Sequence, residues 1–158
     1  METNEEANSI GAIGCILFDA SMKVSRSSSR LPSLGSIIKD TVKGYFSRFI
    51  LLKPTSFFQD TIPLNHEFME VGSITGADMF IPSKVLKQIG LFDPNFFMYF
   101  EETDLQKRME INQFKRLLIS GPEIIHFEGQ SNKSLKKYLM YYQSMFYYVR
   151  KHRLHHIF

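Results

Sequence analysis

The sequence predicts an α/β domain in which helices cover both faces of a sheet. Residues 10–19 form an Ile-rich apolar run that is too short for a typical helix, and such a run indicates a strand buried on both faces. Further along the chain, candidate elements follow in the order strand, helix, strand, helix, helix, strand, helix. This alternation is typical of layered α/β domains.

Composition indicates one soluble domain. The 158 residues are 44% apolar and 22% charged, which is ordinary for a globular protein that buries a core. The single cysteine, Cys15, excludes a disulfide framework, suits a reducing cytosol and is interpreted as a core residue. The acidic N-terminus does not resemble a secretory signal, and no apolar run approaches the roughly 18 residues that a membrane span needs. We therefore expect a cytoplasmic location.

The first half of the chain contains two further candidate elements. Residues 20–36 have loop composition, and apolar residues then recur at helical spacing over 36–52, although Gly44 weakens that helix. Residues 53–70 look irregular. The second candidate strand covers 71–81, where Gly76 leaves room for another backbone or a ligand to approach closely.

The second half is richer in helix. A short helix is expected from Ser83 to Ile89, with Gly90 ending it in a left-handed conformation. A strand over 116–128, broken at Gly121 and Pro122, carries His126. The last helix, 134–152, has one apolar stripe, formed by Leu135, Tyr138, Leu139, Tyr142, Met145, Phe146 and Val149.

The most informative segment lies at 90–112, where an aromatic cluster leads into an acidic helix predicted over 101–112. The rings and carboxylates are Phe96, Phe97, Tyr99, Phe100, Glu101, Glu102 and Asp104. Rings packed around the acids would hold them in a partly dry setting, which can tune their pKa values. Two interpretations remain open, because acids are also favoured in the first turn of any helix. Asp104 faces Arg108 as an i,i+4 ion pair.

The charge distribution and the histidines are less specific. No acidic residue follows Glu128, so the C-terminal end is basic. The last helix could dock on an anionic membrane surface or pack against the sheet. A nucleic-acid partner is not expected, because a broad positive field is missing. His126 has no second histidine at ligand spacing nearby, so it fits a structural role or a metal-binding role.

From Gly76 to Ser131 several segments occur in an order that resembles the C-terminal half of family 2 glycosyltransferases, particularly the rhamnosyltransferase-like branch. These segments are GADMFI, QIG, LFD, FFMYFEETDL, Arg108 and IIHFEGQS. Upstream, AIGCILFD followed by SRSSSRLPSL is similar to the strand and Ser/Arg/Pro segment of the same family. The resemblance extends over nearly the whole chain.

The resemblance implies a partial GT-A-like fold, a mixed-sheet sandwich that binds a nucleoside-diphosphate sugar, with a C-terminal amphipathic helix. It assigns the general base to Glu102, where Glu replaces the usual Asp, with Glu101 as the next candidate. It also implies that Asp78, Phe97 and Tyr99 shape an acceptor pocket. Asp104 and Arg108 would support the acidic helix, and His126 would lie near the metal or diphosphate.

The family's Asp-x-Asp motif, which holds a divalent cation (Mn or Mg), is absent from the sequence. We therefore expect residues 1–131 to be the acceptor-side half of a catalytic domain and 132–158 to be a basic aromatic helix. Such a chain would be inactive alone and would need a missing N-terminal half, as a separate chain or in a longer frame. The expected substrates are a nucleoside-diphosphate sugar and a saccharide or lipid-linked acceptor, at the inner face of the cell membrane. The rival interpretation is a non-catalytic remnant that binds a partner or a membrane.

Overall fold

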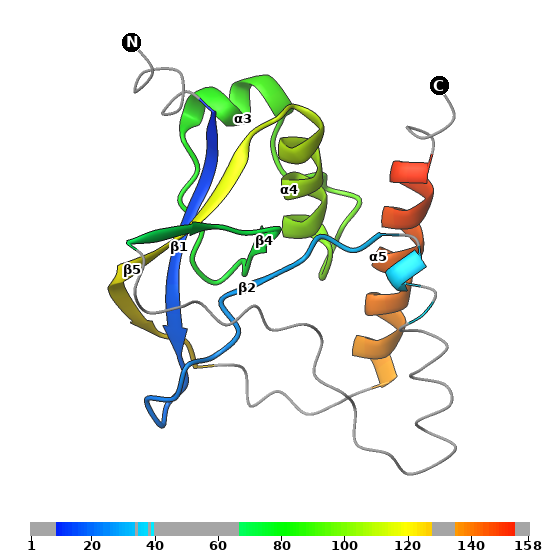
Figure 1. Cartoon of the computed structure of the whole chain (residues 1–158). Coiled ribbons are helices and arrows are strands. Elements are labelled where there is room, and N and C mark those ends of the chain that lie inside the picture. The colour runs from blue at the N-terminus through cyan, green and yellow to red at the C-terminus, as the bar shows by residue number, and fades with distance from the viewer. Residues whose placement is uncertain (1–8, 34, 38, 40–66, 128–134, 154–158) are drawn as a thin grey trace.

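The computed structural model describes residues 9–33, 35–37, 39, 67–127 and 135–153. Figure 1 shows the arrangement of the elements, which in chain order are β1 (Ile10–Phe18), β2 (Ser28–Ser29), β3 (Phe68–Glu70), β4 (Ser73–Ile74), α3 (Ser83–Ile89), α4 (Glu101–Ile111), β5 (Lys115–Ile125) and α5 (Leu135–Arg153). The helix expected over 36–52 lies almost entirely outside the described residues. Most of the stretch expected to be irregular, 53–70, also lies outside them, but its last three residues form strand β3, so the expectation was wrong there. The α/β class is confirmed.

The described strands form two small sheets. In the larger one, β5 is central, with β1 parallel to it on one side and β3 antiparallel on the other. In the smaller one, β2 pairs antiparallel with β4. The predicted strand over 10–19 is confirmed as β1, and eight of its nine residues pair with residues of β5. The mixed sheet is therefore built around the contact between β1 and β5.

The prediction of a single strand over 71–81 was wrong. The chain leaves the larger sheet after β3 and enters the smaller one at β4, and only Phe80 returns to bridge Ile13. Gly72 makes this change of sheet possible, because a Cβ atom there would lie 2.8 Å from the Cα of Arg30. A side chain at position 72 would prevent the two backbones from passing each other.

The predicted interruption of the last strand takes the form of a bulge. Strand β5 continues through Gly121 and Pro122, but its register with β1 shifts between the pairs Cys15–Ile119 and Ile16–Glu123. The extra residues on β5 have no partner on β1, which is how a bulge bends a strand and increases its twist. The strand ends at Ile125, so His126 follows the strand and does not lie within it as expected.

Helices α3 and α4 match the predictions closely. Gly90 ends α3 with a φ of 85°, and its N–H donates to the carbonyl of Leu86. Leu105 and Met109 of α4 are both fully buried, one helical turn apart, against the sheet. The main hydrophobic core lies between these helices and the larger sheet and consists of Ala12, Val71, Ile74, Val85, Ile89, Leu105, Met109, Phe114 and Leu118.

Helix α5 has the predicted position, but most of its predicted apolar stripe does not pack. Met145 is buried, whereas five members of the stripe are exposed, namely Leu135, Tyr138, Leu139, Tyr142 and Phe146. A different face is buried, because Ser144, Tyr148 and His152 meet the segment before α4 and α4 itself. Figure 1 shows α5 beside α4 and apart from the sheet. Among the helices that the structure describes, none has the length and apolar character needed to cross a bilayer.

Candidate active site

The two glutamates of the acidic segment lie in the first turn of α4. A short connection joins the end of α4 to the start of β5, so the helix runs antiparallel to that strand (Figure 1). The first turn of α4 therefore points toward the end of the sheet at which the parallel strands β1 and β5 finish. In open α/β sheets, ligands bind outside the carboxyl ends of the strands, so Glu101 and Glu102 are placed where a ligand is expected.

Glu102 lies against the backbone that follows β4. A Cβ atom at Gly76 would be 3.3 Å from the Cγ atom of Glu102, so the absence of a side chain at Gly76 provides the space that Glu102 occupies. Burial is the main cause that raises the pKa of Glu102, and the charge of Glu101 raises it further, against opposing effects of the residue's own N–H and of Arg26. A carboxylate with a raised pKa accepts a proton more readily than an ordinary glutamate, which suits a general base.

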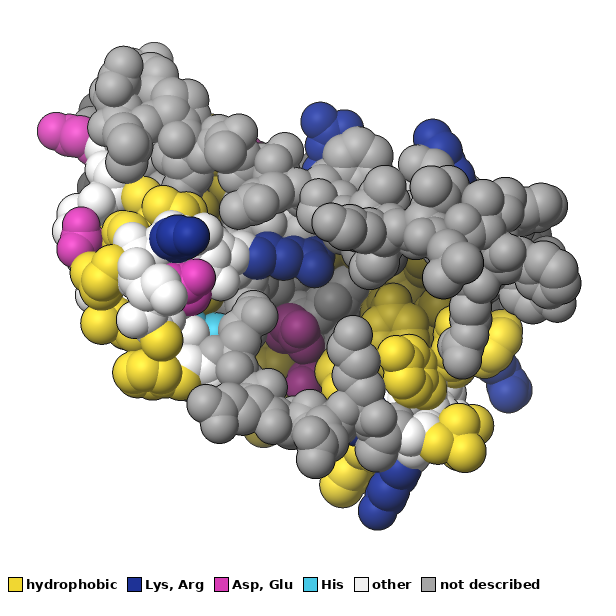
Figure 2. All heavy atoms as spheres, turned by 90° about the horizontal axis from the view of Figure 1, so that it is seen from below, with side chains coloured by type: hydrophobic (Ala, Val, Ile, Leu, Met, Phe, Trp, Pro, Cys, Tyr) yellow, Lys and Arg dark blue, Asp and Glu magenta, His cyan; other side chains and the backbone are white. Residues whose placement is uncertain are grey.

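Glu101 is also half-buried, and one of its carboxylate oxygens, Oε2, is buried without a hydrogen-bond partner among the described residues. Leaving a buried charged oxygen unpaired is costly, so this oxygen can accept a hydrogen bond from a ligand. Figure 2, which views the molecule from the end where β1 and β5 finish, shows acidic side chains recessed below the surrounding surface. Both glutamates are half-buried, which agrees with the partly dry setting expected for them.

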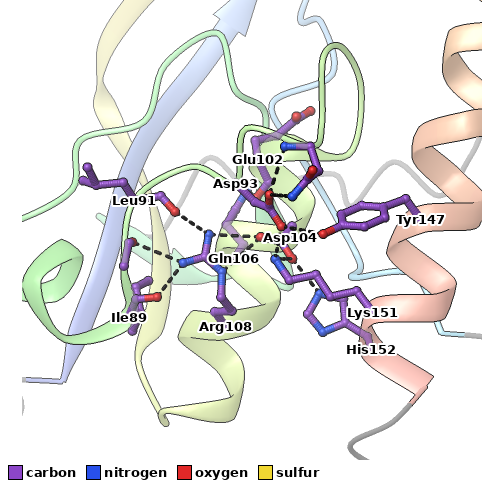
Figure 3. Close-up of polar contacts among 12 residues, drawn as sticks. Ile89, Leu91, Asp93, Glu102, Asp104, Gln106, Arg108, Tyr147, Lys151 and His152 are labelled. Atoms are coloured by element: carbon purple, nitrogen blue, oxygen red, sulfur yellow. Dashed lines mark hydrogen bonds and ion pairs between the residues drawn. The ribbon is translucent and has the colours of Figure 1, made fainter.

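The position of Glu102 depends on Gln106, a residue that sequence reasoning did not single out. The fully buried side chain of Gln106 accepts a hydrogen bond from the N–H of Ile74 at 2.6 Å and donates to its carbonyl at 2.8 Å. It also donates to the carbonyl of Glu102 at 3.2 Å (Figure 3). One side chain therefore joins β4 to the backbone carbonyl of Glu102 and leaves the side chain of Glu102 and the residues before it to be held by other contacts.

The expected ion pair between Asp104 and Arg108 is present, with 3.0 Å between Arg108 Nε and Asp104 Oδ2. Arg108 also donates to the carbonyls of Gly90 and Leu91, which follow the end of α3 (Figure 3). The guanidinium group thereby joins the end of α3 to the middle of α4. Arg108 therefore links the two helices that pack on the sheet.

Asp104 has two more partners that the sequence did not indicate. Its Oδ1 atom lies 2.8 Å from His152 Nε2 and 2.8 Å from Lys151 Nζ, both on α5. Burial alone would raise the pKa of Asp104, but the hydrogen bonds from His152 and Lys151 and the charge of Arg108 hold it below its usual value. No local pattern could reveal these contacts, since Lys151 and His152 lie more than 40 positions from Asp104.

The aromatic run before α4 is divided between the core and the surface. Phe96 is buried and packs edge-on against Tyr147, with ring centroids 4.8 Å apart. Tyr99 is half-buried against Tyr141 at 5.7 Å. Phe97 is 84% exposed, so it can contact an acceptor only as a projecting side chain.

Asp78 is attached to the interior of β1. Its Oδ2 atom accepts a hydrogen bond from the backbone N–H of Cys15 at 2.9 Å. Burial, together with the hydrogen bond and negative charge of Asp78, raises the pKa of the Cys15 thiol to about 12. Cys15 is 3% exposed, which confirms its interpretation as a core residue. Asp78 remains half-buried, and its predicted contact with an acceptor stays a prediction.

His126 follows β5, and its backbone N–H donates to the carbonyl of Phe18 at 2.8 Å. In the part of the chain that the structure describes, no three His, Cys, Asp or Glu side chains are grouped in a way that could hold a metal ion. The donor sets among these residues therefore do not fit a divalent cation, and the contact of His126 with a metal or diphosphate stays a prediction.

Comparison with known proteins finds two relatives that share one name. The chain is 25% identical over 123 residues to the N-acetylglucosaminyl-diphospho-decaprenol L-rhamnosyltransferases of two Mycobacterium tuberculosis strains, CDC 1551 / Oshkosh and ATCC 25618 / H37Rv. The matched region covers 77% of this chain but only 38% of each relative. No family model and no solved structure matches. The similarity suggests a distant relationship to glycosyltransferases.

Proposed function

We propose that this chain forms the acceptor-side part of a family 2 glycosyltransferase with a GT-A-like fold. The complete enzyme would transfer a sugar, with rhamnose as the leading candidate, from a nucleoside diphosphate to a saccharide or lipid-linked acceptor in cell-surface polysaccharide synthesis. The observation that carries the proposal is the half-buried Glu102 in the first turn of α4, with its raised pKa. The similarity to two rhamnosyltransferases supports the same class of reaction.

In the proposed reaction, an acceptor hydroxyl oxygen attacks the anomeric carbon of the donor sugar while Glu102 takes the hydroxyl proton. The new bond joins the acceptor oxygen to the sugar, and the bond between the sugar and the diphosphate breaks with its electron pair on the leaving group. The raised pKa of Glu102 makes its carboxylate a stronger proton acceptor than that of an ordinary glutamate. Asp78, Phe97 and Tyr99 would contact the acceptor.

In the complete enzyme, residues outside this sequence would hold the divalent cation, Mn or Mg, because these 158 residues contain no Asp-x-Asp. Such a cation would neutralise charge on the diphosphate when it is bound. The region that supplies it would be a separate chain or another part of a longer protein. We propose that the complete enzyme is cytoplasmic and peripheral to the inner face of the cell membrane.

One observation favours a second candidate, a non-catalytic module that binds a partner or a membrane. The face of α5 that bears Leu135, Tyr138, Leu139 and Tyr142 forms an open apolar hollow. Exposed cations lie on the same helix, which contains no acidic residue. A helix with these features can bind an anionic lipid surface.

The test measures sugar transfer directly. The chain, alone and combined with a donor-binding half from a related rhamnosyltransferase, is incubated with nucleoside-diphosphate rhamnose, manganese and a saccharide acceptor. We expect acceptor-dependent release of nucleoside diphosphate from the combination, lowered about 100-fold or more by Glu102→Gln. Glu123→Gln, which changes an exposed glutamate on β5, is the matched control and should leave turnover unchanged. Equal turnover in the two variants would remove Glu102 from the reaction.

A further inference from the structure

The backbone immediately before the acidic helix is strained. Tyr99 and Phe100 have φ values of 69° and 65°, and both therefore adopt the left-handed conformation that bulky residues rarely occupy. Two such residues in succession persist only where the surrounding structure holds them in place. Phe100 is the residue from which α4 begins, so this pair sets the direction of the turn that bears Glu101 and Glu102.

The described contacts that hold the strained pair come from α5. Ser144 Oγ donates to the carbonyl of Met98 at 2.7 Å, one residue before the pair. The Tyr141 ring packs against Tyr99 at 5.7 Å and against Phe100 at 5.4 Å between centroids. The buried Tyr148 adds a second ring against Phe100 at 5.3 Å.

Ionic contacts fasten α5 on both sides of the strained pair. Lys151 Nζ lies 2.7 Å from Asp93, which precedes the pair, and 2.8 Å from Asp104, which follows it (Figure 3). Tyr147 donates to Asp93 at 3.0 Å, and His152 lies 2.8 Å from Asp104. Because Asp104 is fully buried, its contacts with α5 are shielded from solvent and have a fixed geometry.

We propose that α5 is a positioning clamp for the acidic turn. In this role Tyr141, Ser144 and Lys151 hold Tyr99 and Phe100 in their left-handed conformation and thereby aim Glu101 and Glu102. The three act through other residues of the chain and are therefore positioning residues. The effect on turnover rests on the proposed function, whereas the effect on the conformation of α4 does not.

The rest of α4 has other attachments, and this makes the clamp specific. Arg108 binds the carbonyls after α3, and Leu105 and Met109 are buried in the core, all without α5. Loosening α5 should therefore release the start of α4 while its second half stays in place. Glu102 would then move away from Gly76 toward solvent, and its pKa would fall toward the usual value for glutamate.

Two matched pairs of variants test the clamp in the full chain. Ser144→Ala and Lys151→Met remove clamp contacts, whereas Gln143→Ala and Arg150→Met change exposed neighbours on the same helix. Amide hydrogen exchange is followed in residues 104–106, whose N–H groups close the first turn of α4, and, as a reference, in β1 and β5. We expect the clamp variants to lose at least about tenfold more protection in 104–106 than in the strands, and the controls to lose none. Carbon-13 NMR titration should also show a lower Glu102 pKa in the clamp variants.

Unchanged protection in 104–106 and an unchanged Glu102 pKa in both clamp variants would overturn the proposal. A loss of protection in β1 and β5 as large as that in 104–106 would also overturn it, because α5 would then support the whole fold rather than the start of α4. Neither measurement depends on catalysis. If the clamp variants behave as expected and no sugar transfer is found, only the proposed function fails.

Discussion

The side-chain amide of Gln106 pairs with both backbone polar groups of Ile74, accepting from the N–H at 2.6 Å and donating to the carbonyl at 2.8 Å. In this way a helix residue supplies the contact that a neighbouring strand would otherwise make to the short strand β4. The same amide donates to the carbonyl of Glu102. The relationship connects the small sheet to the turn that bears the candidate base.

Replacing Gln106 by methionine should destabilise the fold strongly. The substitution keeps the volume but leaves the buried N–H and carbonyl of Ile74 without partners, at a cost of about 2 to 4 kcal/mol in the free energy of unfolding. Urea denaturation followed by circular dichroism measures this difference. Gln88→Met on α3 is the control, because Gln88 is exposed, and it should change the free energy by less than about 0.5 kcal/mol. Similar values for the two variants would contradict the role of Gln106.

A methyl group at Gly14 should also be poorly tolerated. It would overlap the side chain of Ile74 and lie 2.9 Å from the carbonyl oxygen of Asp78, which is backbone and cannot rotate away. Overpacking of this kind costs about 3 kcal/mol. At Gly121, by contrast, a methyl group would meet nothing within 4 Å. Thermal unfolding of Gly14→Ala and Gly121→Ala compares the two sites, and a loss of stability in the second as large as in the first would show that the bulge is packed.

Acid should weaken the contacts between α5 and the rest of the chain. Burial would raise the pKa of Asp93, but hydrogen bonds from Lys151, Asn95 and Tyr147 hold it below its usual value, and the pKa of Asp104 is lowered in the same way. A lowered folded-state pKa contributes stability above the unfolded value of about 3.9, and this contribution is lost as pH falls through the folded value. Unfolding free energy should therefore decrease steeply below about pH 4.

The Lys151→Met variant isolates this effect. Because Lys151 is a shared partner of both carboxylates, the variant should be less stable at neutral pH and should lose less additional stability in acid. Arg150→Met is the control and should follow the unaltered chain. Urea denaturation at several pH values measures all three proteins. Parallel pH profiles for Lys151→Met and the unaltered chain would exclude the ionic contacts as the cause.

Local patterns in the sequence predicted the helices and the local ion pair well. Gly90 ends α3, and the i,i+4 spacing of Asp104 and Arg108 gives the expected contact, because such features depend on residues within one or two turns. The strand expected over 71–81 failed for a nonlocal reason. The chain changes sheets at Gly72 where it meets the backbone of Arg30, and nothing within 71–81 signals that encounter.

The candidate site shows the same division. The glutamates could be found from the aromatic run and the helix start, whereas Gln106 reads as an ordinary helix residue until β4 is placed beside it. On α5, periodicity identified an apolar stripe, but the buried face instead includes Ser144 and His152. That face is selected by the carbonyl of Met98 and the carboxylate of Asp104, which are polar partners that a hydrophobic pattern cannot reveal.

The proposed role of Glu102 requires a partly buried carboxyl group whose pKa is higher than that of an ordinary glutamate. Carbon-13 NMR titration of its side-chain carboxyl group, assigned by comparison with Glu102→Gln, measures this most directly. We predict a pKa above the usual value of about 4.3 for glutamate, because burial and the neighbouring charge of Glu101 disfavour the ionised form. A Glu102 pKa at or below that usual value would contradict the account.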